Sequence, residues 1–201
     1  MELIDEVVEL AGRRLVLRRP PDAEALLDER AFEHEEFLPY WAELWPSGLA
    51  LAERVATLPL QGTRVAELGC GLGLPSLAAA AVGADVLATD WAPDAIALLR
   101  ENAARNDIRL RAEIVPWDEP EPLLAGGPWD LLLAADVLYE RRNADRLLEL
   151  LPRLGREVWL ADPSRPHTQR FLEAAASEWQ IDTTPDEGHA RLAIHRLRRI
   201  P

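Results

Sequence analysis

Three glycines at alternate positions, Gly69, Gly71 and Gly73, restrict the folds open to this chain more than any other feature. An apolar run that contains Glu67 precedes them, and the alanine-rich segment 76–82 follows at once. This order predicts a buried strand, a tight turn and the start of a helix. Glycines let the backbone adopt positive φ and let a ligand touch the main chain, while the first helical turn offers free N–H groups. The stretch therefore predicts a ligand-binding turn at the end of a strand.

Apolar strand and helix patterns alternate from Gly62 onward and predict an α/β fold. Strands are expected at 64–68, 85–89, 110–115, 129–135 and 158–161, helices at 74–82, 93–106, 143–151 and 168–178, and a linker at 116–128. The last two strands, 179–183 and 190–197, are joined by a short turn and should pair antiparallel. We expect a doubly wound sheet of seven strands that is mostly parallel, with an antiparallel C-terminal strand and helices on both faces.

The N-terminal part of the chain precedes this alternation and has a different pattern. The runs 2–10 and 13–19 flank a small Ala11-Gly12 turn, which is typical of a β-hairpin. The acidic segment 22–36 allows a helix that Asp22 would cap. We therefore expect a hairpin and a helical extension ahead of the sheet.

An aromatic passage at 37–48 follows, with four aromatic residues within nine positions, and an amphipathic helix is expected at 49–58. One interpretation is a hydrophobic clamp that packs the N-terminal segment onto the core. The other is a lid whose rings line a cofactor or substrate. The whole chain, 1–201, is expected to form one domain, with a lead-in at 1–61 and a cofactor-binding core at 62–201.

Charge and composition limit the partners and the compartment. The 201 residues carry a net charge of −13, which repels phosphate backbones and disfavours a nucleic-acid partner. No basic and apolar leader and no long apolar stretch stands in the sequence, so we expect no signal peptide and no membrane partner. A single cysteine fits a reducing cytoplasm. The pattern leaves the oligomeric state open.

Acidic residues stand where four of the expected strands end: Asp90, Asp118, Asp136 and Asp162. Open parallel sheets bind ligands outside the carboxyl ends of their strands. Asp90 follows Gly69 by 21 residues, the spacing expected of a carboxylate that accepts hydrogen bonds from a ribose diol. The strand ends thus predict a nucleotide-like ligand.

The glycine turn departs from the pattern that binds a dinucleotide. Leu74 stands where a third glycine of that pattern would be, and Pro75 removes one of the free N–H donors of the helix. The acidic Glu67 suits a cationic amino-acid group better than an anion. The turn therefore favours a ligand without a pyrophosphate.

Several segments together resemble one known class of enzyme. The run 65–90 with Trp117-Asp118 resembles the nucleotide-binding half of class I, seven-strand S-adenosylmethionine-dependent methyltransferases, which have a Rossmann-like sheet. The segments 44–48 (Leu-Trp-Pro-Ser-Gly) and 136–139 (Asp-Val-Leu-Tyr) are similar to the seven-strand protein lysine methyltransferases, including bacterial members that act on electron transfer flavoprotein. The segment 162–165 (Asp-Pro-Ser-Arg) resembles one in those bacterial relatives, some of which are labelled nicotinamide methyltransferase-like.

The resemblance, which covers about 37–171, implies a site for S-adenosylmethionine, whose product is S-adenosylhomocysteine, and it implies no metal. The implied cofactor-binding residues are Trp45, Glu67, Gly69, Cys70, Gly71, Gly73, Asp90, Trp91, Trp117, Asp118 and Ala135. Glu67 and the glycines would hold the methionine part, and Asp90 the ribose. Trp91, Trp117 and Asp118 would surround the adenine. Asp136 and Tyr139 are the implied catalytic residues, beside the sulfonium and the acceptor channel.

Plainer interpretations stand beside these roles. Asp136 could only cap the next turn or pair with Arg141 or Arg142, and Arg165 could bind an acidic acceptor or pair with Asp162. Cys70 is more plausible as a small packed thiol than as a nucleophile, because no histidine or lysine stands near it.

Three functions remain open at this point. The first is an N-methyltransferase that acts on a protein lysine, in which Asp136 attracts and orients the amine. The second is an N- or O-methyltransferase for a small molecule such as a heteroaromatic amine. The third is a non-catalytic cofactor-binding module.

Overall fold

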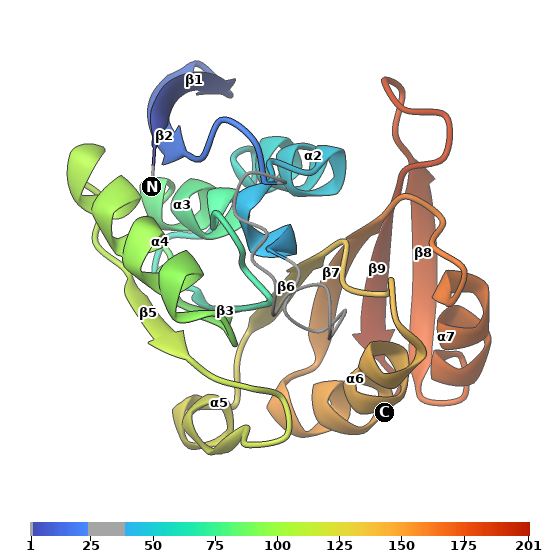
Figure 1. Ribbon diagram of the computed structural model, residues 1–201. Helices are drawn as coiled ribbons and strands as arrows, with labels where there is room; N and C mark the ends of the chain where they lie inside the picture. Colours follow the sequence, from blue (N-terminus) through green and yellow to red (C-terminus); the bar gives the residue numbers. More distant parts are fainter. Residues whose placement is uncertain (1, 24–38) are drawn as a thin grey trace, which may run out of the picture.

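The computed structural model describes residues 2–23 and 39–201 and contains a sheet of seven strands (Figure 1). The strands lie in the order β5-β4-β3-β6-β7-β9-β8. Their bounds are β3 Arg64–Leu68, β4 Asp85–Asp90, β5 Arg111–Ile114, β6 Leu131–Ala135, β7 Glu157–Asp162, β8 Trp179–Pro185 and β9 Ala193–Arg199. Only β9 runs antiparallel to its neighbours, β7 and β8. The expected fold class is confirmed. The helix expected at 22–36 and the first two residues of the aromatic passage lie outside the described residues, apart from Asp22 and residue 23.

Helices cover both faces of the sheet (Figure 1). Their bounds are α2 Pro46–Val55, α3 Leu74–Ala81, α4 Pro93–Arg105, α5 Glu121–Gly126, α6 Arg141–Leu154 and α7 Thr168–Ala175. Successive side chains of β6 enter two separate cores: Leu131 and Leu133 pack with α2, α3 and α4, whereas Leu132 packs with α5, α6 and α7. A strand that is buried on both faces reads as a continuous apolar run, and this is why the sequence pattern located the strands well.

The expected linker at 116–128 is wrong in one respect, because it contains the short helix α5. Its prolines and glycines are typical of a loop. Tertiary contacts form the helix nevertheless: Leu123 is fully buried, and its carbonyl accepts a hydrogen bond from Trp129 Nε1 at 2.9 Å. Trp129 itself was expected to begin a strand, but it makes only an isolated bridge with Gly155 ahead of β6.

The N-terminal hairpin is confirmed, and it forms a separate two-stranded sheet. Strands β1 (Ile4–Leu10) and β2 (Arg13–Arg19) pair antiparallel in the register expected from the Ala11-Gly12 turn. One face of the hairpin buries Val8, Leu10 and Leu17 in the core that α3 and α4 share.

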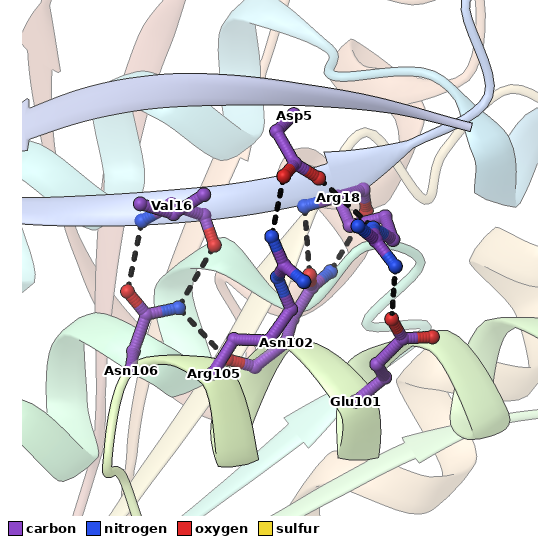
Figure 2. Close-up of polar contacts among 7 residues, drawn as sticks. All are labelled: Asp5, Val16, Arg18, Glu101, Asn102, Arg105 and Asn106. Atoms are coloured by element: carbon purple, nitrogen blue, oxygen red, sulfur yellow. Dashed lines mark hydrogen bonds and ion pairs between the residues drawn. The ribbon is translucent and has the colours of Figure 1, made fainter.

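Asn102 of α4 and Asn106, the C-cap residue of that helix, hold the free edge of β2 (Figure 2). Asn102 accepts a hydrogen bond from the Arg18 N–H at 2.7 Å and donates one to the Arg18 carbonyl at 2.9 Å. Asn106 makes the same pair of bonds with Val16, at 2.8 and 2.9 Å. Residues four apart on a helix rise by about 6 Å, close to the roughly 6.7 Å repeat of alternate strand residues. The asparagines therefore act as a neighbouring strand for β2.

Replacing Asn102 with alanine is expected to lower the free energy of unfolding by about 2 kcal/mol, because it leaves the Arg18 N–H and carbonyl without partners. Amide hydrogen exchange at Arg18 should accelerate at the same time. Glu101→Gln is the matched control, since the Glu101 side chain is exposed and its ion pair with Arg18 is worth little. Unchanged protection of the Arg18 amide in Asn102→Ala would contradict this account.

Candidate active site

A cavity of about 350 Å³ opens at the carboxyl ends of β3, β4, β5 and β6. Every residue that the sequence proposed for the cofactor or for catalysis lines it: Trp45, Glu67, Gly69, Cys70, Gly71, Gly73, Asp90, Trp91, Trp117, Asp118, Ala135, Asp136 and Tyr139. The strand ends meet here because parallel strands deliver their carboxyl ends to one edge of the sheet. The individual roles of these residues stay predictions.

The glycine turn requires its glycines. Gly71 has φ +51, and a side chain there would approach the Trp41 carbonyl to 3.2 Å. Gly73, the N-cap of α3, has φ +73, and a side chain there would overlap Leu99. The turn is therefore packed between the aromatic passage and α4, and its backbone faces the cavity.

Asp90 organises the same turn. Its Oδ2 accepts a hydrogen bond from the Gly71 N–H at 2.8 Å, and its Oδ1 accepts one from the Ala92 N–H at 2.9 Å. The side chain is almost fully buried, and this burial raises the pKa of the carboxyl against the lowering effect of its N–H donors. A carboxylate offers about four acceptor sites, so capacity for a ligand diol is left.

Glu67 is buried where β3 enters the turn, and it binds the start of α3. Its Oε2 accepts hydrogen bonds from the Ser76 N–H, at 2.9 Å, and from the Ser76 hydroxyl. Burial raises the pKa of Glu67 to about 8, opposed by the two Ser76 bonds and reinforced by Asp90. Glu67 is thus a neutral acid at pH 7 that would ionise next to a cationic group.

Cys70 is a packed thiol, as the plainer interpretation held. It is buried, and burial together with the nearby Asp90 and Glu67 carboxyls raises the pKa of the thiol well above its usual value. Since the thiolate is the nucleophile, this thiol is inert at neutral pH.

The expected adenine side of the cavity is open to solvent. Trp91 is 42% exposed, and Asp118 has an exposed side chain whose Oδ2 lies 3.7 Å from Arg146 Nη2. Trp117 is half-buried and packs against the core below the cavity. Flat rings beside a carboxylate suit a flat base that donates a hydrogen bond.

Asp136 pairs with Arg165, and not with either arginine considered from the sequence. Arg165 donates from Nε to Oδ1 at 2.6 Å and from Nη2 to Oδ2 at 3.0 Å. Arg141 lies beside Asp145 instead, and Arg142 beside Glu140. Arg165 also touches Asp162, but only through its backbone N–H, at 2.9 Å.

Three aromatic side chains, Tyr40, Trp45 and Tyr139, line the same cavity as Asp136, and the exposed ring of Tyr40 marks its mouth. The Tyr40 ring lies 5.3 Å from the Tyr139 ring and 6.4 Å from the Trp45 ring, measured between centroids. Trp45 Nε1 donates to the Tyr40 carbonyl at 2.8 Å, and the Arg165 guanidinium lies 5.5 Å from the Trp45 ring. Burial raises the pKa of Tyr139, which keeps it a neutral phenol. This placement favours the lid interpretation of the aromatic passage, and it adds Tyr40, which the sequence did not single out.

A seven-stranded sheet of this order, with a glycine turn and acidic strand ends around one cavity, has the fold of the class I methyltransferases. The architecture matches the T. thermophilus 16S rRNA N2 G1207 methyltransferase RsmC, in complex with AdoMet and guanosine, with a TM-score of 0.73 over 98% of this chain and 51% of that one. Identity is 16%, so this likeness concerns the fold alone.

The chain belongs to the lysine methyltransferase family, whose model matches residues 39–171. It is 34% identical to the electron transfer flavoprotein beta subunit lysine methyltransferase of Xenopus laevis, over 75% of this chain and 65% of that protein. It is 36% identical to the ribosomal protein L11 methyltransferase of Synechococcus sp. (strain RCC307), over 75% of this chain and 52% of that protein. The chain thus spans between half and two thirds of the length of these relatives.

Proposed function

We propose that the protein transfers a methyl group from S-adenosylmethionine to a lysine side chain of a protein substrate. One observation carries this proposal: the glycine turn, the buried acids Glu67 and Asp90, and Asp136 all line one cavity. The chain that forms this cavity belongs to the lysine methyltransferase family. We further propose that the protein works in the cytoplasm. No helix among residues 2–23 and 39–201 is long and apolar enough to cross a membrane.

The residues around the turn fit this cofactor from end to end. Glu67 would meet the cationic amino group, Asp90 would accept from the ribose hydroxyls, and Trp91 would lie against the base. When bound, the cofactor supplies a methyl group on positively charged sulfur. The protein then has to align the acceptor with that methyl and exclude competing nucleophiles, so positioning dominates and the proposal involves no metal.

The mouth of the cavity suits a slender cationic acceptor. The rings of Tyr40, Trp45 and Tyr139 offer faces that attract cations, and the net charge of −13 favours a basic partner over nucleic acid. The acceptor ammonium must lose its proton before transfer. Both oxygens of Asp136 already accept hydrogen bonds from a guanidinium. We therefore assign it the orientation of the amine.

Tritium-labelled S-adenosylmethionine tests the proposal. Electron transfer flavoprotein beta subunit and ribosomal protein L11 are the first acceptors to try, because the relatives' names point to them, and a total protein extract is the third. We expect label on protein lysine and a mass increase of one or more methylene groups. Asp136→Asn should slow labelling on the order of 100-fold, whereas Asp145→Asn on the surface of α6 should not.

Other outcomes separate the alternative functions. Label confined to small metabolites would replace the lysine acceptor with a small-molecule one. Absence of cofactor binding in calorimetry would leave only a non-catalytic role.

A further inference from the structure

Arg165 is a charged residue beside the site, and the proposed methyl transfer assigns it no role. It follows β7, whereas Asp136 follows β6, so the bidentate pair joins two neighbouring strand ends. Asp136 is buried and lines the cavity, while the Arg165 side chain is one-third exposed and is absent from the described residues that line it. The guanidinium thus pairs with both oxygens of a carboxylate that lines the cavity, while Arg165 itself is not among the described lining residues.

The other charged and titratable groups around the pair leave this neutralisation intact. The hydrogen bonds to Asp136 raise the pKa of the Arg165 guanidinium, with smaller contributions from Asp162 and Tyr40, so Arg165 stays positively charged. Oδ1 of Asp162 accepts hydrogen bonds from the Thr168 hydroxyl and the Arg165 N–H, whereas Oδ2 is buried and has no hydrogen-bond partner among the described residues. At the mouth, Glu140 is paired with Arg142. Glu43 also lines the cavity, as does the neutral phenol of Tyr139.

We propose that Arg165 is a positioning residue that makes the acceptor amine easier to deprotonate by cancelling the charge of Asp136. This inference rests on the proposed lysine acceptor. An isolated carboxylate beside an ammonium favours the charged form and raises its pKa by about one to three units. A carboxylate already paired with a guanidinium keeps its hydrogen-bonding oxygens for orientation without that penalty.

In the proposed methyl transfer, water accepts the proton of the acceptor ammonium. The ammonium gives its proton to solvent, and the nitrogen lone pair then forms the new bond to the methyl carbon. The bond between that carbon and sulfur breaks, and its electron pair stays on sulfur. The pair of Arg165 and Asp136 takes no proton in this sequence.

The pH dependence of labelling tests the inference directly. In Arg165→Gln the amide can still donate to Asp136, but the positive charge is lost. We expect the rise of the initial rate with pH to move upward by about one unit or more, while Arg165→Lys keeps the wild-type profile. Arg170→Gln, which breaks an exposed ion pair between Arg170 on α7 and Asp145 on α6, is the matched control and should change nothing. A uniform loss of rate in Arg165→Gln with an unshifted profile would make Arg165 merely structural and overturn the inference.

A binding measurement tests the same inference without turnover. The probe is n-butylammonium, which has the shape of a lysine side chain, titrated by NMR into protein saturated with S-adenosylhomocysteine. Arg165→Gln should bind it about tenfold more tightly than wild type, and Asp136→Asn/Arg165→Gln should lose this gain. Equal affinity in wild type and Arg165→Gln contradicts the inference. If S-adenosylhomocysteine binds but no protein is labelled, the proposed function fails while this titration still decides the role of Arg165.

Discussion

Asp90→Ala is expected to weaken the binding of S-adenosylmethionine by at least about 100-fold. The Asp90 carboxylate is the proposed acceptor for the ribose diol, and two hydrogen bonds to a charged group account for about 3 kcal/mol or more. The same carboxylate holds the N–H groups of Gly71 and Ala92. Loss of the Asp90 carboxylate therefore removes a ligand contact and, at the same time, two hydrogen bonds that hold the glycine turn in place.

Calorimetric titration with S-adenosylmethionine measures this effect. Asp90→Asn keeps the volume and one acceptor oxygen, so it retains one of the two N–H bonds that hold the turn and disturbs the turn less than alanine does. It should still bind at least tenfold more weakly than wild type. Asp85→Ala, at the exposed start of the same strand, is the matched control. An Asp90→Asn protein that binds within threefold of wild type would remove Asp90 from the proposed ribose contact.

Strands and strand ends were predictable because their signals are local. A doubly buried strand is a continuous apolar run, and its last residue marks the edge of the sheet. Once β3, β4 and β6 were located, the meeting of Gly69, Asp90 and Asp136 at one cavity followed from parallel topology alone. In the structure, all three residues line the same cavity, as this topology requires.

Partners that are distant in sequence were not predictable in the same way. Arg165 reaches Asp136 across 29 residues, whereas the sequence suggested the nearer Arg141 and Arg142. Tyr40 and Tyr139 are far apart in the sequence, yet their rings are in contact where both line the cavity. The helix α5 forms because Leu123 is buried, although its own sequence resembles a loop. In each case a tertiary contact decided what local pattern left open.

The second large effect is the pH dependence of stability that the ionisation of Glu67 causes. Its pKa of about 8 lies above the usual 4.5, so between these two values the folded protein holds a proton that the unfolded chain has released. The stability that this carboxyl contributes is complete below pH 4.5 and is lost as the pH rises through 8. Glu67→Gln cannot ionise, so its unfolding free energy relative to wild type should increase by a few kcal/mol between pH 5 and pH 8.

Cofactor binding should expose the same proton. The cationic amino group of S-adenosylmethionine stabilises the ionised carboxyl, so wild-type protein at pH 7 should release about one proton on binding. Calorimetry in two buffers of different ionisation enthalpy counts that proton. Glu67→Gln should release none and bind about tenfold more weakly, while Glu53→Gln, on the exposed face of α2, should match wild type. An equal proton count in Glu67→Gln and wild type would mean that Glu67 only fastens β3 to Ser76 and that another group meets the amino end of the cofactor.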